Sequence, residues 1–471
     1  MADFDLAVIG AGSGNTIPDE RFADWRIAFC EQRLFGGTCL NVGCIPTKMF
    51  VHTADVARTV ADAARFGVDA ELRRVRWADI VSRIFGRIDP LAAAGANYRR
   101  AAPNTEVFAA HTRFADPLPD GTHRLRTVDG DEFTAERVVI AAGSRPMVPE
   151  PIASAGVPFH TSDTIMRIPE LPERLIIVGG GAVACEFAHV FGALGVRVTM
   201  LIRSGTLLRG HDDEIATRFT DLAGRRWEIH GHTEVAGLRR DGTGVAVTCT
   251  GGAVVRGDAL LVATGRIPNG DLLDAGRAQV AVTDGGRVVV DAYQRTSARG
   301  VFALGDVCSP YRLKHVANHE ARVVRHNLLV DWDDTAAMVP ADHRFVPAAV
   351  FTDPQLATVG LTENAARAAG HRVRVKVQDY ADVAYGWALE DTTGIAKLIA
   401  DADTGLLLGA HLMGPEASSL IQPLVQAMTT GLPVRDMARG QYWIHPALPE
   451  VVENALLALC GEPPWPDPKR H

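Results

Sequence analysis

Short apolar runs that end beside glycine are the first regular pattern in the sequence. Residues 5–9 form such a run and lead directly into the glycine-rich segment 10–15. A second apolar run, residues 26–30, ends at Glu31. Short apolar runs that end at glycine are typical of strands in dinucleotide-binding units. The N-terminal segment therefore predicts a strand, a glycine turn with a helix after it, and a second strand.

The same arrangement recurs near the middle of the chain. Residues 175–178 are apolar and lead into a second glycine-rich segment, 179–184, and then into a helical stretch that Gly195 ends. A further strand is predicted at 196–202. Two segments that each begin as a strand followed by a glycine turn predict two dinucleotide-binding domains in one chain.

Later strands that end in glycine mark the limits of these domains. The runs 138–143 and 260–265 each finish in glycine, and the run 296–306 finishes in Gly-Asp. We expect each of the first two to close one nucleotide-binding unit. The third is expected to return the chain to the first unit.

From about residue 345 the pattern changes to that of an α+β domain. The predicted strands and helices of this domain are 373–377, 395–400 and 406–413 for strands, and 418–430 and 449–459 for helices. The predicted fold class is α/β, with two Rossmann-like domains and this C-terminal α+β domain. The expected boundaries are 1–148 for the first nucleotide-binding domain, 149–269 for the second, 270–342 for the return segment and 343–471 for the C-terminal domain. The proline-rich tail, 463–468, is predicted to be extended.

Composition excludes several classes of protein. Of 471 residues, 47% are hydrophobic and 22% are charged, which is enough apolar material for a large core. The net charge of −8 is spread along the chain, without the Lys/Arg tract of a nucleic-acid-binding protein. No apolar run approaches the ~18 residues of a membrane span, and the acidic N-terminus is unlike a signal peptide. We expect a soluble, cytoplasmic protein that binds neither nucleic acid nor membranes.

The first glycine segment has the pattern of a pyrophosphate-binding turn. Gly10 permits the tight turn and Gly12 lets backbone N–H groups approach phosphates. Glu31 lies ~20 residues further on, at a strand end, where its carboxylate can accept hydrogen bonds from a ribose. Asn15 replaces the third glycine, and Pro18 is expected to shorten or bend the helix that follows.

The second glycine segment keeps Gly179 and Gly181, but the end of its second strand is different. Ile202 occupies the usual acidic position, and Arg203 and Arg209 follow it. A carboxylate there would repel a 2′-phosphate, whereas guanidinium groups pair with it. The pattern favours NADPH over NADH, and the alternative is a pair of solvated surface arginines.

Two of the seven cysteines stand out, because Cys39 and Cys44 are close together among glycines. Residues five apart on a regular helix are roughly 140° apart, so Gly43 must distort the turn if the thiols are to meet. Lys48 and the start of the following helix are expected to lower thiol pKa values. A redox dithiol is favoured. The alternatives are two inert cysteines or a zinc half-site, for which only His52 is near; we expect no metal.

A histidine and a carboxylate lie close together near the C-terminal end. His445 precedes Pro446, and Glu450 follows at the start of a predicted helix. A glutamate in this position can orient an imidazole and raise its pKa, which suits proton transfer to a thiol. A structural His-Pro at a helix start is the alternative.

Taken in order, these segments resemble the pyridine nucleotide–disulfide oxidoreductases over nearly the whole chain. That family includes glutathione reductase, dihydrolipoyl dehydrogenase, mercuric reductase and mycothione reductase. The segments most specific to the family are Gly36–Lys48 and His445-Pro446 with Glu450. Four stretches are most similar to the mycothione reductases: 12–16, 44–50, 313–318 and 441–456. The resemblance implies a homodimer that uses FAD and NADPH to reduce a small disulfide, here mycothione, through a redox-active Cys39–Cys44 pair.

The resemblance also implies roles for single residues. Cys44 is expected to lie against the flavin and Cys39 to attack the substrate, with His445 and Glu450 reaching the site from the other subunit. Lys48 is expected near the flavin, paired with Glu186. The residues expected to line the FAD site are Gly10, Gly12, Gly14, Glu31, Thr38, Lys48, Gly143 and Asp306. Those expected on the NADPH side are Gly179, Gly181, Glu186, Arg203, Arg209 and Gly265.

One position departs from the family pattern, and two other functions are alternatives. Ala182 stands where an aromatic residue often covers the nicotinamide pocket, so that pocket is expected to be more open.

The rival enzyme is an NAD-dependent dihydrolipoyl dehydrogenase. The rival outside enzymology is a flavin-bound redox sensor that turns over no small disulfide. Mercuric and large thioredoxin reductases carry an extra C-terminal cysteine pair, whereas this tail has only Cys460.

Overall fold

The computed structural model describes residues 2–116 and 118–460, and the predicted extended segment 463–468 lies outside them. The chain divides into two compact units. The first contains residues 1–176, 236–248 and 254–342, and the second contains residues 177–235, 249–253 and 343–471. The four domain boundaries expected from the sequence stay a prediction.

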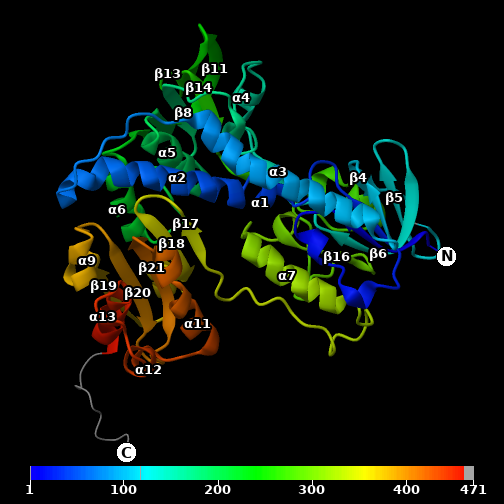
Figure 1. Ribbon diagram of the computed structural model, residues 1–471. Coiled ribbons are helices and arrows are strands. Elements are labelled where there is room, and N and C mark those ends of the chain that lie inside the picture. The colour runs from blue at the N-terminus through cyan, green and yellow to red at the C-terminus, as the bar shows by residue number, and fades with distance from the viewer. Residues whose placement is uncertain (1, 117, 461–471) are drawn as a thin grey trace, which may run out of the picture. The chain divides into compact units, whose positions relative to one another are not determined.

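The first unit is built on a seven-stranded sheet (Figure 1). Its strand order is β3-β2-β1-β6-β5-β4, and β16 also pairs with β6. Strands β1, β2, β3, β6 and β16 pair in parallel, whereas β4 and β5 extend the sheet antiparallel. The strands are β1 (Phe4–Ile9), β2 (Ile27–Cys30), β3 (Thr105–Phe108), β4 (Thr112–Phe114), β5 (His123–Thr127), β6 (Glu132–Ile140) and β16 (Val301–Ala303).

Four of the parallel strands end in register at one edge of this sheet. Ile9 lies opposite both Cys30 and Ile140, and Ile140 lies opposite Ala303. The loops that follow these strands therefore leave from the same edge. In open α/β sheets this carboxyl edge is where ligands bind.

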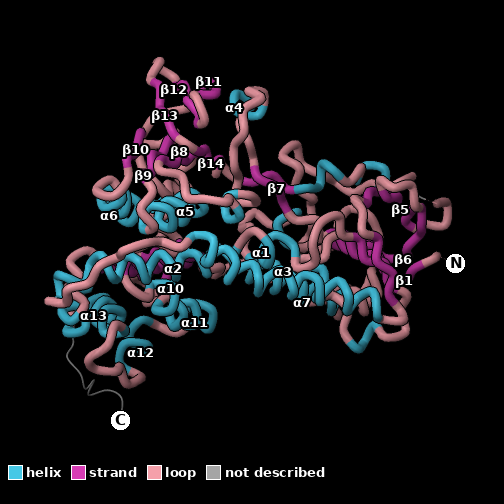
Figure 2. The backbone as a smooth tube through the Cα atoms, turned by 45° about the horizontal axis from the view of Figure 1, so that its top comes forward, coloured by secondary structure: helices cyan, strands magenta, loops and turns pink. Residues whose placement is uncertain are grey.

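Both faces of the sheet are buried, which explains why β1 is apolar throughout. Leu6 and Val8 join one apolar cluster, together with Val324, while Ala7 and Ile9 join the cluster on the opposite face. Successive side chains on a strand point to opposite faces, so both sets must be apolar. Helix α3 packs against α2 (Figure 2), and it also packs against β3. The α-helices of this unit are α1 (Gly37–Asn41), α2 (Cys44–Asp62), α3 (Trp77–Ala101), α4 (Glu150–Ala153) and α7 (Lys314–Asn327).

The helix predicted after the first glycine segment is reduced to a single 3₁₀ turn, η1 (Ser13–Thr16). Pro18 has no N–H group and disfavours helical backbone at the residue before it, so the turn does not continue as an α-helix. A second 3₁₀ turn, η2 (Glu20–Phe22), leads on to β2.

Two small sheets complete the strands of the first unit. Strand β7 pairs antiparallel with β15, and β12 lies between β11 and β13. The bounds of these strands are β7 (Ser144–Pro146), β11 (Val235–Asp241), β12 (Gly244–Cys249), β13 (Val254–Gly257) and β15 (Arg266–Pro268).

The second glycine segment follows β8, which belongs to a smaller sheet with the strand order β10-β9-β8-β14. The division between the two units runs through β8. In contrast to the first glycine segment, the second leads into a regular helix, α5 (Ala182–Ala193), as predicted. The other elements are β8 (Arg174–Val178), β9 (Arg197–Leu201), α6 (Asp213–Ala223), β10 (Glu228–His230) and β14 (Ala259–Val262).

The C-terminal part of the second unit is an antiparallel sheet with helices, as predicted. The strand order is β17-β18-β21-β20-β19. The helix predicted at 418–430 is interrupted at Ile421; Pro423, near the start of the second piece, lacks the N–H that would continue a helix. The elements are β17 (Ala348–Val350), β18 (Gln355–Gly360), α8 (Glu363–Ala368), β19 (Val373–Asp379), α9 (Ala384–Ala388), β20 (Ile395–Asp401), β21 (Leu407–Gly414), α10 (Ala417–Leu420), α11 (Gln422–Thr430), α12 (Val434–Arg439) and α13 (Pro449–Cys460).

Within residues 2–116 and 118–460, no helix combines the length and the apolar character needed to cross a bilayer. The same part of the chain contains no group of His, Cys, Asp and Glu side chains that could hold a metal ion.

Candidate active site

The first glycine turn is held in a conformation that only glycine tolerates. Gly10 has φ +103°, and a Cβ atom there would collide with the backbone carbonyl of Ala141. Gly14 is buried, and a Cβ on it would lie 2.8 Å from the side chain of Val8. Gly10 and Gly14 therefore let the turn lie directly on the carboxyl edge of the sheet.

Glu31 braces this turn from the end of β2. One carboxylate oxygen accepts a hydrogen bond from the Ala11 N–H at 2.8 Å, and the other accepts one from the Arg33 N–H at 2.9 Å. The carboxylate is thus fixed beside the turn, at the position expected for a ribose contact. That contact stays a prediction.

A second glycine pair packs against the first turn without any side chain between them. A Cβ on Gly37 would lie 2.8 Å from the Cα of Gly12, and the Gly36 N–H donates to the Ala11 carbonyl at 2.9 Å. Gly37 is the first residue of α1, which carries Thr38 and Cys39. The close backbone contact therefore places the first cysteine beside the glycine turn.

The two cysteines lie on either side of a break between two helices. Cys39 is in α1, and Cys44 is the first residue of α2. The break falls at Val42 and Gly43, and a Cβ on Gly43 would lie 2.8 Å from the Thr38 carbonyl oxygen. Gly43 thus permits the distortion that the spacing required, and the two thiols are hydrogen-bonded to each other.

The electrostatics of the reduced pair differ from the expectation. The hydrogen bond with Cys44 raises the pKa of the Cys39 thiol, and burial raises it further. In the reduced pair, the hydrogen bond between the two sulfurs favours the protonated, neutral form of Cys39. The positive charge of Lys314 on α7 lowers the pKa of Cys39, whereas the sequence had pointed to Lys48.

Lys48 lies instead along the face of α2 that continues from Cys44. It lines a cavity of about 500 Å³ together with Cys44, Ile45, Met49, His52 and Arg83. Arg83 of α3 donates to the Thr53 hydroxyl at 2.8 Å. The cavity opens beside Cys44 and is lined by cationic, imidazole and apolar groups.

Asp306, in the 3₁₀ turn Gly305–Val307 that follows β16, is held by a chain of polar contacts. Its carboxylate accepts from the Ser144 hydroxyl at 2.6 Å, and Arg266 donates to the same hydroxyl at 2.7 Å. Gly143 precedes Ser144 with φ +66° and has open space where a Cβ would be. The Ser144 contact thus joins Asp306 to the segment that begins at Gly143, and the expected contacts of both residues with FAD stay a prediction.

Beneath Asp306, a buried glutamate holds the same loop. Glu320 of α7 accepts from the Gly305 N–H at 2.6 Å and is 1% exposed. Burial raises the pKa of Glu320 to about 7. Sequence reasoning missed Glu320 because its partner is distant in the chain.

The second glycine turn has the predicted form. Gly179 has φ +129° and its N–H donates to the Leu201 carbonyl at 3.0 Å, while Gly181 caps α5 and faces open space. Glu186 on α5 is buried and accepts from the Phe351 N–H at 3.0 Å. Its expected pairing with Lys48 stays a prediction. Gly265, with φ +129°, lies between β14 and β15 in the first unit and directly precedes β15.

The two arginines expected to recognise a 2′-phosphate are both accessible. The side chain of Arg203 is 63% exposed and lies 3.9 Å from the Glu234 carboxylate, which is a weak pairing. Arg209 is exposed. Ile202, in the usual acidic position, is buried. The site can therefore receive an anionic group.

His445 and Glu450 are brought together in the second unit. The imidazole Nδ1 lies 2.7 Å from a Glu450 carboxylate oxygen, and the other oxygen accepts from the Ala447 N–H at 3.2 Å. The His445 side chain is 71% exposed and that of Glu450 is 16% exposed. A fixed carboxylate thus orients an accessible imidazole, which suits proton transfer to a group from outside.

The comparison with protein families decides what this assembly of residues belongs to. The model described as pyridine nucleotide-disulphide oxidoreductase matches residues 4–321, and the dimerisation domain of the same family matches residues 346–456. The chain belongs to the pyridine nucleotide-disulphide oxidoreductases. The predicted family, fold class and enzyme class are confirmed, and the two predicted cofactors, FAD and NADPH, are those of this family.

Individual members of the family are similar over nearly their whole length. A mycothione reductase of Mycobacterium tuberculosis is 64% identical over 459 residues, which cover 98% of this chain and 100% of that protein. A glutathione reductase of Burkholderia cepacia is 32% identical over 453 residues, covering 95% and 97%. Among solved structures, the HOCl-induced flavoprotein disulfide reductase RclA from Escherichia coli superposes with a TM-score of 0.83 at 28% identity, covering 96% and 99%.

The carboxyl edge of this oxidoreductase fits an FAD. The glycine turn presents backbone N–H groups for a pyrophosphate, and the carboxylates of Glu31 and Asp306 are acceptors for hydroxyl groups. Asn41 is buried and donates to the Phe35 and Gly37 carbonyls at 3.0 and 2.9 Å. Its Oδ1 accepts no hydrogen bond from any described residue. A buried acceptor of this kind indicates a missing polar partner.

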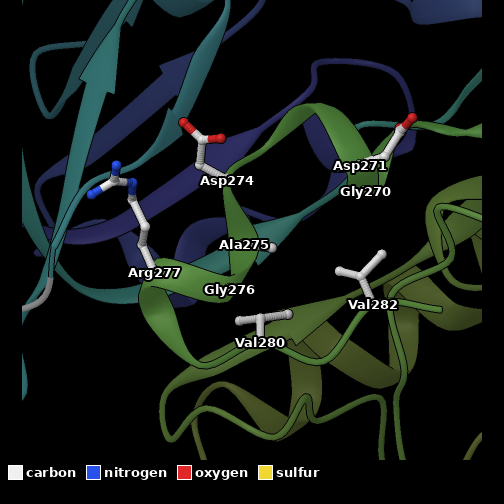
Figure 3. Close-up of a pocket in the computed structure, with 8 residues that line it drawn as sticks. All are labelled: Gly270, Asp271, Asp274, Ala275, Gly276, Arg277, Val280 and Val282. Carbon is white, nitrogen blue, oxygen red and sulfur yellow. The ribbon is translucent and has the colours of Figure 1, made fainter. Parts of the chain in front are cut away.

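A different pocket of the oxidoreductase, shown in Figure 3, carries no part of this site. It has a volume of about 440 Å³ and lies over the loop that contains Asp271, Asp274 and Arg277. These charges are already paired within the first unit: Asp271 with Arg145, Asp274 with Arg113 and Arg277 with Asp116. The pocket therefore offers an anionic or cationic ligand no uncompensated charge.

Proposed function

We propose that this chain is an NADPH-dependent flavoprotein disulfide reductase that reduces mycothione, the disulfide of mycothiol, to the thiol. The observation that carries the substrate is the 64% identity to the Mycobacterium tuberculosis mycothione reductase over 98% of the chain. The overall reaction consumes one NADPH, one proton and one disulfide, and yields NADP⁺ and two thiols.

The chain's own residues divide the sulfur chemistry between them. Cys39 thiolate attacks one sulfur of the substrate, the substrate S–S bond breaks, and one thiol leaves with a proton from His445. Cys44 then attacks the mixed disulfide at Cys39, which releases the second thiol and leaves the Cys39–Cys44 disulfide. FAD, when bound, carries electrons from NADPH to that disulfide. Each sulfur step needs a thiolate and an accessible target sulfur.

The site residues act by position as well as by chemistry. Glu450 holds the His445 imidazole through the 2.7 Å contact, so the proton is delivered from a fixed direction. Glu31, Asp306 and the glycine turn would hold FAD, and Gly181, Arg203 and Arg209 would hold NADPH.

We further propose that the active sites are shared between two subunits of a homodimer. The match to the family's dimerisation domain at residues 346–456 supports the dimer. The imidazole of His445 is largely exposed in this chain, which suits a group that acts in a neighbouring subunit. The cytoplasm is the proposed location, because free thiols are kept reduced there.

The rival substrate class is the dihydrolipoyl group, since a dihydrolipoyl dehydrogenase of Thermus scotoductus is 33% identical over 479 residues. Cofactor preference separates the two readings, because the exposed Arg203 and Arg209 favour a 2′-phosphate. A strong preference for NADH would contradict the proposal.

The decisive experiment follows NADPH oxidation by the purified enzyme with mycothiol disulfide, glutathione disulfide and lipoamide at equal concentrations. We expect kcat/KM to be highest for mycothiol disulfide by at least about tenfold, or ~1.4 kcal/mol of transition-state binding. Similar values for the three disulfides would remove the substrate assignment. No turnover with any of them would favour a redox sensor.

The variant Cys39→Ser serves as the matched control for the sulfur chemistry. It leaves Cys44 and the flavin in place, so reduction of the flavin by NADPH should continue while disulfide turnover stops. Surviving turnover would show that Cys39 is not the attacking thiol.

A further inference from the structure

A lysine from a distant part of the chain reaches the region of the redox cysteines. Lys314 is the first residue of α7, and its ammonium donates to the Ser13 hydroxyl at 2.8 Å. Ser13 belongs to the glycine turn, in the 3₁₀ turn η1. Within residues 2–116 and 118–460, Lys314 forms no ion pair with a carboxylate, and its ammonium is held by the Ser13 hydroxyl.

One backbone contact, between Gly12 and Gly37, links the turn that holds this lysine to the helix that carries Cys39. The residue before Ser13 is Gly12, whose Cα would lie 2.8 Å from a Cβ on Gly37. Gly37 begins α1, and Cys39 follows two residues later. The ammonium is therefore tethered to the turn on which the cysteine-bearing helix rests.

The charges acting on Cys39 are few. The titratable groups that act on this thiol are Cys44, whose hydrogen bond raises its pKa, and Lys314, whose positive charge lowers it. The first turns of α1 and α2 contain no acidic residue. Lys314 is thus a cation placed to offset the cost of forming a thiolate in a half-buried pair.

We propose that Lys314 is a positioning residue that keeps one sulfur of the reduced Cys39–Cys44 pair as a thiolate. The proposal rests on the proposed disulfide reductase function and adds the group that tunes its nucleophile. On reduction the pair holds two thiols; one S–H bond then breaks, its proton passes to water, and the positive charge of Lys314 favours the thiolate that remains. The thiol hydrogen bond between the two sulfurs is retained.

The test measures the pH dependence of the thiolate directly in the two-electron-reduced holoenzyme. The rate of alkylation by iodoacetamide and the thiolate-to-flavin absorbance band are followed against pH for the wild type and for Lys314→Met. We expect the midpoint of both curves to move up by about one pH unit, so that alkylation at neutral pH slows by about tenfold. Lys314→Arg should keep both midpoints close to the wild-type values, because it keeps a cation at this position.

Two controls make the result specific. Lys376→Met removes a lysine from β19 in the second unit and should leave both midpoints unchanged. Lys314→Gln tests the same loss of charge with a side chain that can still bond to Ser13, in case Lys314→Met does not fold. Flavin content and thermal midpoint are recorded for every variant.

Two outcomes would overturn the proposal. One is an unchanged midpoint in both Lys314→Met and Lys314→Gln with flavin retained. The other is loss of flavin with normal thiol titration, which would make Lys314 a cofactor-retaining residue only. Failure of the proposed substrate is separable, because the thiol midpoints are measured without any disulfide substrate.

Discussion

Glu320 is the residue whose burial has the clearest energetic consequence. It lies under the loop that carries Asp306, accepts from the Gly305 N–H and has a pKa raised from 4.5 to about 7, chiefly by burial. A carboxyl group whose pKa is raised in the folded state binds more protons there than in the unfolded chain. Stability from this group is therefore fully present below about pH 4.5 and is lost as the pH rises to about 7.

The variant Glu320→Gln removes this pH dependence while keeping an oxygen for the Gly305 N–H. We expect the wild type to lose on the order of 3 kcal/mol more unfolding free energy than the variant between about pH 5 and about pH 8. Urea unfolding midpoints at the two pH values measure the difference. Glu136→Gln, on the exposed side of β6, is the control. Parallel pH profiles for wild type and Glu320→Gln would contradict the assignment.

Arg203 and Arg209 give a second prediction at the scale of single residues. Each charge-assisted contact to a 2′-phosphate contributes about 1.5–3 kcal/mol. The double variant Arg203→Ala/Arg209→Ala should therefore raise KM for NADPH by at least about tenfold and leave KM for NADH nearly unchanged. Initial rates with the two nucleotides measure the change. The exposed Arg225→Ala provides the comparison, and an equal rise for both nucleotides would point to a general loss of binding.

Sequence patterns identified the residues that lie within short motifs, and missed those whose partners lie far along the chain. Cys39, Cys44 and Glu31 were found because glycines and strand ends flank them. Lys314 was missed as a charge near the thiols, since it contacts Ser13 across 301 residues. Asn41 was missed because its buried, unpaired oxygen follows from packing, which leaves no signature in residue spacing.

At the scale of elements, the first glycine turn differs from the second. The second leads into the twelve-residue helix α5, whereas the first leads only into η1. A single turn has little of the macrodipole that makes a helix N-terminus attract phosphate. Arg99 at the end of α3 holds this turn: it donates to the Asn15 side chain at 2.7 Å and to the Asn15 carbonyl at 2.5 Å.

Arg99 is therefore expected to matter for retention of FAD. Its guanidinium is largely buried, lies 4.7 Å from the Phe29 ring and supports the turn that we propose binds the pyrophosphate. We predict that Arg99→Met weakens FAD binding by about 10–100-fold, corresponding to the loss of one or two charged hydrogen bonds. Fluorescence titration of apoprotein with FAD measures this. Arg100→Met, at the exposed neighbouring position, should bind FAD normally; equal binding by Arg99→Met would contradict the role.

Helices and strands were predicted well where burial fixes the pattern of apolar residues. They were predicted less well where a local break in the hydrogen bonding sets the end of a helix. The strands that meet at the carboxyl edge were expected, because strands buried on both faces must be apolar. A shortened first helix was expected from Pro18, but its reduction to a single 3₁₀ turn and the break at Ile421 were not, since each depends on how the chain near one proline rearranges its hydrogen bonds.

At the scale of the whole molecule, the proposed sharing of sites between subunits makes a specific prediction. Cys39→Ser and His445→Ala are each expected to inactivate the homodimer. In a heterodimer of the two, one site combines the intact Cys39 of one subunit with the intact His445 of the other. Mixed refolding or co-expression should therefore restore about a quarter of the wild-type activity per subunit, as random pairing of a two-fold dimer requires.

Two controls accompany this complementation. Each variant alone, treated in the same way, should remain inactive. A mixture of two Cys39 variants, Cys39→Ser with Cys39→Ala, should also remain inactive, because no pairing then contains an intact nucleophile. Absence of recovery in the first mixture, with heterodimers shown to be present, would place each complete site within a single chain.

The backbones of Gly12 and Gly37 touch without a side chain between them, so one contact is expected to support both flavin binding and the reactivity of Cys39. A methyl group gained at Gly37 would push the flavin-binding turn and the helix of Cys39 apart by the same movement. Loss of the yellow colour and loss of thiol reactivity should then arise together in random mutagenesis at this position. Substitutions at Gly37 are therefore expected to impair flavin binding and thiol reactivity together. This position is a poor starting point for engineering a new activity into the fold.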